Sequence, residues 1–258
     1  MAPNLDDVLT AAGIDSQTMK DIGAKEIGLK YLTVSSADPL SIWQSVRKGV
    51  QACGYWPVFV GSPAEFARLR PMFEAAEDLN AVRSQIETGV AFDIAEWVNL
   101  DEHSFDDDDE DDEPDSDDGE DDDFDTDDVE DDEFEPATLT EDDLTFGGRD
   151  GNELVLLLVP TDISWEVPAY LMLGRGSQMH DPYHHVAMHK RWFERYEAEL
   201  ISVTNDSVEM LVKAPPETIP DAERLAVEHC VYCPDLGDTV AHLAAERVDC
   251  GVWTFWWD

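Results

Sequence analysis

The residues best suited to metal chemistry lie in one short stretch, HDPYHHVAMH, which holds four histidines. His185 and His189 are four residues apart, so a helix would place both imidazoles on one face, as two ligands of one metal ion require. His180 or His184 would approach the same ion from the start of that helix. The stretch lacks an HExxH motif, and no neighbouring carboxylate is placed as a general base. The alternative is therefore a set of core, capping and surface histidines.

A second candidate is the pair Cys230 and Cys233, because a CxxC motif binds zinc or exchanges a disulfide in many proteins. Tetrahedral zinc needs a second tight ligand pair, which Cys53, Cys250 and His229 do not form. Redox pairs normally begin a helix, where the dipole lowers a thiol pKa, whereas this pair is expected at a helix end. We favour two small, partly buried thiols followed by a helix-stopping proline. The alternative is zinc or another divalent metal, with the candidate ligands His180, His185, His189, Cys230 and Cys233.

No motif for nucleotide binding or nucleophilic catalysis is complete. Gly174-x-Gly176 follows a predicted strand as a phosphate loop would, but Met179 occupies the place of the third glycine and no GK[ST] follows. The sequence also lacks a GxSxG elbow. A glycine turn is the better interpretation, and the sequence favours a non-catalytic role while leaving catalysis open.

Aromatic side chains dominate the closing WTFWWD. Alternation along a strand would place Trp253, Phe255 and Trp257 on one face, with Thr254 and Trp256 on the other. Bulk on both faces favours a central strand covered by helices, and hence core packing. The alternative leaves Trp256 or Trp257 at a partner-binding groove, because Trp is enriched at the centres of protein interfaces.

The most unusual stretch is the acidic run, residues 101–143, which holds 28 Asp and Glu and no Lys or Arg. It has too little apolar surface to offset an ordering cost of about 1–2 kcal/mol per residue, and its carboxylates repel one another. We therefore predict that residues 103–140 are disordered. Apolar anchors spaced within acid can bind a basic partner, with charge setting the approach and the rings setting the register. The anchors here are Phe105, Phe124 and Phe134, with Val129 between them.

Charge restricts the classes of partner. The 258 residues carry 60 acids and 16 bases, a formal charge of −44, and outside the acidic run 32 acids still face 16 bases. Binding to nucleic acid or to an anionic membrane is not expected, because each phosphate contact needs a cation. The balance favours a basic protein partner or metal cations. Salt adaptation is a further explanation, since Lys is scarce at six residues.

The sequence predicts a cytoplasmic location. The N-terminal MAPNLDDVLTAAGID has acids where a secretory signal has Lys or Arg, and no apolar window approaches the length of a membrane span. The four cysteines, scattered apart from one pair, are therefore expected to be free thiols.

Helices and strands are predicted on both sides of the acidic run. Strand 30–36, a helix that starts at Asp38-Pro39, and strand 55–61 fit a βαβ unit. Residues 73–99 are predicted to be helical, with a possible break at Gly89. After the run we expect strands at 153–159 and 167–174, a hairpin around 204–206 and a terminal strand, with helices at 184–198, 220–231 and 239–247.

These elements predict an α/β or α+β fold with a central mixed sheet of about five to seven strands covered by helices. Its parts would be an N-terminal α/β part at 1–102, an acidic insertion at 103–140 and a C-terminal part at 141–258.

Landmarks in the C-terminal half occur in a recognisable order: VPA, HVAMHKRWFERYEAELISV, KAPP, AERLAVEHCVYCPD, HLAA and WTFWWD. With them, this half resembles the bacterial domain of unknown function family 4253 (DUF4253). A looser likeness lies in WQSVRKGVQACGYWPVFVG. Met179-His180 stands where many members have Cys-Pro, Glu197 replaces a usual glycine, and the acidic run is peculiar to this chain. The resemblance implies a fold and no chemistry.

We therefore expect a non-catalytic cytoplasmic interaction protein, immunity-like, that binds a basic protein partner. The alternative is a metal-binding protein or hydrolase that uses His180, His184, His185 and His189.

Overall fold

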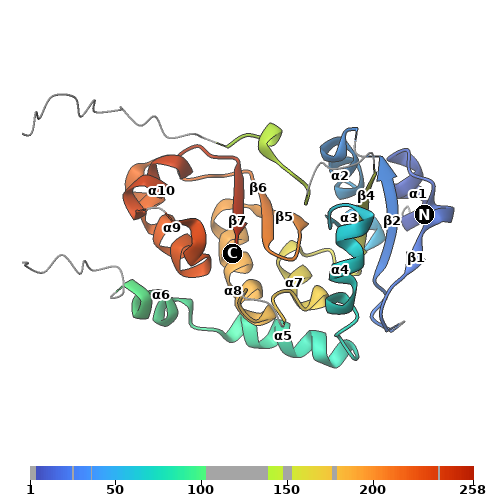
Figure 1. Cartoon of the computed structure of the whole chain (residues 1–258), viewed down its shortest axis with the longest axis horizontal. Helices are drawn as coiled ribbons and strands as arrows, with labels where there is room; N and C mark the ends of the chain where they lie inside the picture. Colours follow the sequence, from blue (N-terminus) through green and yellow to red (C-terminus); the bar gives the residue numbers. More distant parts are fainter. Residues whose placement is uncertain are drawn as a thin grey trace, which may run out of the picture.

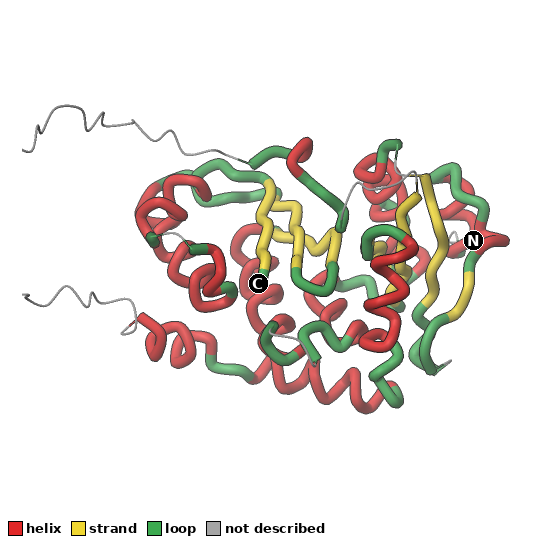
Figure 2. The backbone as a smooth tube through the Cα atoms, viewed as in Figure 1, coloured by secondary structure: helices red, strands yellow, loops and turns green. Residues whose placement is uncertain are grey.

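The computed structural model describes residues 4–24, 26–35, 37–102, 139–147, 153–175, 179–237 and 239–258, and for residues 99–102 the backbone alone. The segment predicted to be disordered, 103–140, lies outside the described residues except for Leu139 and Thr140. The described elements form one mixed seven-stranded sheet with helices around it (Figures 1 and 2), as the sequence predicted. The strands are β1 (Lys20–Asp21), β2 (Lys30–Ser35), β3 (Trp56–Phe59), β4 (Glu153–Val159), β5 (Ala198–Val203), β6 (Ser207–Val212) and β7 (Val252–Trp256).

The described helices surround this sheet on several sides (Figure 1). They are α1 (Leu5–Ala11), α2 (Pro39–Arg47), α3 (Val50–Cys53), α4 (Pro63–Phe73), α5 (Leu79–Ala91), α6 (Ile94–Glu102), α7 (Val167–Leu171), α8 (Pro182–Tyr196), α9 (Ile219–Tyr232) and α10 (Val240–Arg247). Short 3-10 turns are η1 (Ser16–Thr18), η2 (Glu141–Asp143), η3 (Ser164–Glu166) and η4 (Pro234–Leu236). Helix starts follow the sequence signals: Asp38 Oδ1 accepts from Ser41 N at 3.1 Å, and Ser62 Oγ accepts from Glu65 N at 3.2 Å.

Strand order shows that both flanks of the acidic run build the same sheet. The order is β1-β2-β4-β3-β5-β6-β7, with β3 and β5 parallel and the other neighbours antiparallel. β4 follows the run in sequence, yet it pairs with β2 on one side and β3 on the other. β2 and β3 are therefore parallel to each other, but β4 separates them. The two strands of the predicted βαβ unit are therefore not adjacent, because β4, which follows the run in sequence, lies between them.

Helices cover both faces of the sheet. Glu199, Leu211 and Val252 are direct cross-strand neighbours on β5, β6 and β7, so they share a face, and α2 reaches that face through Arg47. Trp253 points the opposite way and contacts Trp192 of α8, with ring centroids 5.8 Å apart. The sheet is therefore sandwiched between α2 on one face and α8 with α9 on the other.

Residues 167–174, predicted as a strand, contain the helix α7 instead. Pro168 occupies the first turn of this helix, where its missing N–H costs nothing. Gly174 follows at φ 84°, and a side chain there would overlap the His180 carbonyl group. The β propensity of Val167 and Tyr170 is outweighed by the packing of this segment against α8.

Two further predictions need correction. Gly89 does not break a helix: α5 continues through it, and an added Cβ would lie 2.6 Å from the Tyr183 carbonyl oxygen of α8. The absence of a side chain lets α5 and α8 cross closely at this point. β7 was expected in the centre of the sheet, but it forms one edge.

Candidate functional site

Two of the predicted metal ligands, His185 and His189, lie in the core on either side of Tyr232. The Tyr232 hydroxyl is 2.6 Å from His185 Nδ1 and 2.9 Å from His189 Nε2, and His185 Nε2 is 3.1 Å from the His180 carbonyl oxygen. Because a carbonyl only accepts, His185 Nε2 must carry the proton and Nδ1 must accept from Tyr232. The tyrosine oxygen then accepts from His189 Nε2–H. The three side chains thus form one directed hydrogen-bond chain from α8 to α9.

The side chains of His185, His189 and Tyr232 are uncharged at neutral pH. Burial lowers the pKa of His189 to about 3 and lowers the pKa of His185 well below its usual value, with help from the neighbouring histidines. Burial also raises the pKa of Tyr232 well above 10. The facing nitrogens of both rings already bond to Tyr232, and the described part of the chain holds no group of three or more His, Cys, Asp or Glu side chains suited to a metal ion. The geometry therefore favours a structural role for this pair.

The other two histidines, His180 and His184, lie in an aromatic cluster outside that chain. Both rings are 5.0 Å from Trp97 of α6, and His184 is 4.9 Å from Phe92. A groove of about 770 Å³ opens beside them between α5, α6 and the start of α8. We call it the aromatic–acidic groove, and its lining residues are Glu87, Thr88, Ala91, Phe92, Asp93, Glu96, Trp97 and His184.

The cysteine pair lies at the end of α9, as predicted. Cys230 and Cys233 are buried free thiols, and Cys233 Sγ donates to the Trp256 carbonyl oxygen at 3.0 Å. Burial raises the pKa of Cys233 to about 12, so the thiol is protonated at neutral pH. The thiol instead satisfies a carbonyl group of β7 at the edge of the sheet.

The predicted partner-binding residues Trp256 and Trp257 differ in exposure. Trp256 is 49% exposed at the sheet edge, whereas Trp257 is buried, with its ring centroid 5.3 Å from that of Tyr232. Phe105, Phe124 and Phe134 lie outside the described residues. The alternation predicted for the terminal strand is correct, because Trp253, Phe255 and Trp257 are all buried.

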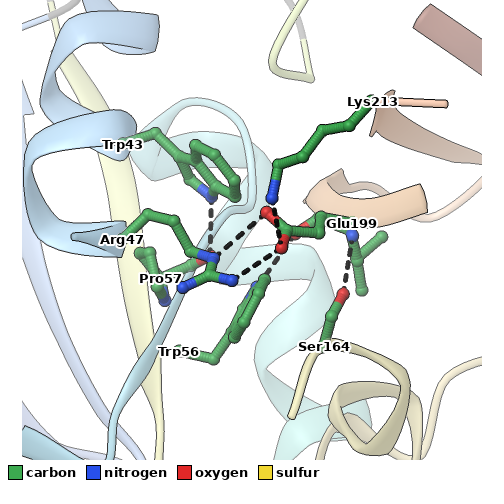
Figure 3. Close-up of polar contacts among 8 residues, drawn as sticks. Trp43, Arg47, Trp56, Pro57, Ser164, Glu199 and Lys213 are labelled. Atoms are coloured by element: carbon green, nitrogen blue, oxygen red, sulfur yellow. Dashed lines mark hydrogen bonds and ion pairs between the residues drawn. The ribbon is translucent and has the colours of Figure 1, made fainter. Parts of the chain in front are cut away.

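Figure 3 shows a buried ion cluster that the sequence reasoning missed. The Glu199 side chain is 2% exposed and accepts from Arg47 Nη2 at 2.6 Å, Arg47 Nε at 3.1 Å and Lys213 Nζ at 2.8 Å. The Arg47 guanidinium also lies 4.3 Å from the Trp56 ring centre. This cluster joins α2, which precedes the acidic run, to β5 and to Lys213 directly after β6, which both follow the run.

Polar groups around Glu199 also form hydrogen bonds (Figure 3). Trp43 Nε1 donates to the Pro57 carbonyl at 2.9 Å, Trp56 Nε1 donates to Leu200 O at 3.0 Å, and Ser164 Oγ accepts from Leu200 N at 2.8 Å. A cavity of about 670 Å³ lies beside the cluster. With two cations around it, the carboxylate links α2, β5 and the residue after β6 through charge-assisted hydrogen bonds.

Two other buried carboxylates also link separate elements, one through backbone amides and one through arginines. Glu209 accepts from Thr145 N at 2.7 Å and Phe146 N at 2.9 Å, which ties the segment after the acidic run to β6. Glu228 of α9 accepts from α8, taking Arg191 Nε at 2.8 Å and Arg195 Nη1 at 2.9 Å. The sequence signal that could have found these acids is a glutamate within an apolar strand or helix, as in AELISV and SVEMLV. A carboxylate buried there needs a hydrogen-bond or ion-pair partner.

Comparison with known proteins bears out the resemblance of the C-terminal half. Residues 155–258 match a family described as "Domain of unknown function (DUF4253)". The match begins within β4 and covers α7 to α10 and β5 to β7. Comparisons with curated proteins and with solved structures find no match. Among the helices that the structure describes, none is long and apolar enough to cross a membrane.

Proposed function

We propose, for a chain whose C-terminal portion matches DUF4253, that the protein is a non-catalytic binding module for a basic protein partner. The observation that carries this proposal is the acidic run, with 28 acids and no base, inserted into a fold that is itself acidic. A field of this strength steers a cationic protein toward it and raises the association rate. An immunity-like role follows if the basic partner is a toxin.

The points at which the run joins the fold support this assignment. Before the run, α6 contacts α9; after it, Thr145 and Phe146 are fixed by Glu209 of β6. Both anchors belong to the helices and strands around the β7 end of the sheet (Figure 1). A partner attracted by the run would therefore arrive at this end, where Trp256 is exposed.

We place this activity in the cytoplasm. The four cysteines are free thiols, and three of them are buried, which fits a reducing compartment. The metal-dependent alternative has less support, because two of its four histidines are engaged by Tyr232 in the core.

Two variants of equal length test the proposal against the full chain. In the first, the Asp and Glu residues of 106–135 become Asn and Gln while the aromatic residues stay. In the second, Phe105, Phe124 and Phe134 become Ser while the charges stay. Each protein would be immobilised and exposed to host lysate at low and at physiological salt, with bound proteins identified by mass spectrometry.

We expect the full chain to retain a basic protein at physiological salt. The first variant should lose it at both salt concentrations, because the attraction is gone. The second should retain it at low salt only, because the rings supply the contacts that survive screening. Equal retention of the same proteins by all three would overturn the proposal, as would the retention of no basic protein by the full chain.

A further inference from the structure

The aromatic–acidic groove has a composition that suits a cation with a flat, apolar face. Its walls include Phe92 and Trp97, whose ring centroids are 5.5 Å apart at an interplanar angle of 74°. Three exposed acids, Glu87, Asp93 and Glu96, complete the lining, and no Lys or Arg belongs to it. A cation between such rings and carboxylates is attracted by both, since the ring faces carry negative charge.

The histidine in the lining does not oppose such a ligand at neutral pH. Burial, and then the neighbouring His180, lowers the pKa of His184 below its usual value, so the ring is neutral at pH 7. Asp93 Oδ1 accepts from Glu96 N at 3.1 Å, which caps α6 and leaves its second oxygen able to accept from a ligand.

Two other cavities differ from the groove in charge, whereas the cavity lined by Asp38, Glu141 and Asp142 also has no Lys or Arg but has only one ring, the buried Phe146. The cavity beside Glu199 contains Arg47, Lys48 and Lys213, and a cavity between α6, α8, α9 and α10 contains three arginines. Each of those cavities supplies its own cations to its acids. The aromatic–acidic groove has no cation among its lining residues, so a cationic partner would meet no competing Lys or Arg there.

Position connects the groove to the acidic run. Asp93, Glu96 and Trp97 lie on α6, which ends at Glu102, where the run has already begun. Five residues of helix separate Trp97 from that point, or about 7.5 Å at 1.5 Å per residue. A basic protein drawn to the run would thus find the groove within the reach of one or two of its residues.

We propose that the aromatic–acidic groove binds an arginine side chain of the basic partner. This inference rests on the proposed function above. The guanidinium plane stacks on Trp97 or Phe92 while its edge donates to the carboxylates of Asp93 and Glu96. Arginine suits both contacts because it is planar and presents several donors in one plane, whereas the compact ammonium group of lysine cannot stack. At about 770 Å³, the groove is within the size range of ligand pockets, so it also admits residues flanking the arginine.

The test uses the full chain with ¹⁵N-labelled tryptophan and follows the indole N–H signals by NMR. The Trp97 signal is assigned from its absence in a Trp97→Phe variant. The probe is acetyl-triarginine amide, and its matched control is acetyl-tricitrulline amide, which has nearly the same shape without the charge. Acetyl-trilysine amide, added separately, has the charge without the planar group.

We expect triarginine to shift the Trp97 signal saturably, trilysine to do so at least severalfold more weakly, and tricitrulline to leave it in place. The combined variant Glu87→Gln, Asp93→Asn and Glu96→Gln keeps the helix cap and should weaken triarginine binding on the order of tenfold. A control variant with Glu77→Gln, Glu153→Gln and Glu217→Gln removes three other exposed acids and should bind as the unaltered chain does.

A Trp97 signal that triarginine does not move would overturn the inference. Equal weakening in the two triple variants would also overturn it, because only net charge would then matter. Either result can coexist with capture of a basic protein by the full chain, which would leave the proposed function standing. A Trp97 response confined to arginine, together with failure to capture any basic protein, would instead keep the groove and reject the wider proposal.

Discussion

The acids of the core and the acids of the aromatic–acidic groove are the same residue types in opposite situations. Glu199 is buried and accepts from Arg47 and Lys213, which makes it part of the framework. Glu96, Asp93 and Glu87 are exposed beside aromatic rings, with no Lys or Arg among the lining residues. A buried carboxylate must be satisfied within the fold, whereas an exposed one is free to take a partner from outside. The difference separates acids that stabilise from acids that bind.

Glu199→Gln should give the largest effect in this comparison. The change leaves Arg47 in a mostly buried site without its carboxylate, so we expect the free energy of unfolding to fall by about 3 kcal/mol. Urea unfolding followed by circular dichroism measures it. Glu153→Gln, an exposed acid on β4, is the control and should leave the urea midpoint unchanged. Equal midpoints for the two variants would mean that the ion cluster does not stabilise the fold.

Glu209→Ala tests a buried acid that accepts from backbone amides. The Thr145 and Phe146 amides would lose their acceptor, and a loss of about 2 kcal/mol is expected. The loss should be accompanied by faster hydrogen exchange at these two amides, while the amides of β5 keep their protection. Uniform acceleration across the whole sheet would contradict a local anchoring role for Glu209.

The buried histidines extend the comparison to pH. The pKa of His189 is about 3 in the folded state, below about 6.5 for an unfolded chain, so the unfolded state binds the extra proton first. The stability due to this depressed pKa is fully present above pH 6.5 and is lost as the pH falls, by about 2 kcal/mol at pH 5. The difference in unfolding free energy between pH 7 and pH 5 should therefore shrink by this amount in His189→Gln. An unchanged difference would place the titration elsewhere.

The groove acids should show the smallest effect on stability. The variant with Glu87→Gln, Asp93→Asn and Glu96→Gln alters three exposed side chains and preserves the α6 cap, so its urea midpoint should equal that of the unaltered chain. A clear decrease in the midpoint would show that these acids support the fold, and the contrast with Glu199 would then disappear.

Local signals in the sequence predicted most of the elements. Asp38 and Ser62 mark helix starts because their side chains accept from the backbone amide three residues on, which depends on nearby atoms alone. The alternation of WTFWW likewise predicted the buried face of β7, because the pleat of a strand is a local property. The acidic composition and the resemblance of residues 155–258 to DUF4253 could also be read directly.

Tertiary contacts decided the rest. The position of β4 between β2 and β3 depends on pairing across the acidic run, and no local pattern near Glu153 specifies its neighbours. Residues 167–171 became a helix because packing against α8 outweighed their β propensity. Arg47 and Glu199 are 152 residues apart in sequence, and Trp97 meets His184 from a different helix. A site made of residues distant in sequence comes into existence only when the chain folds, because its energy lies in contacts between elements and not within them.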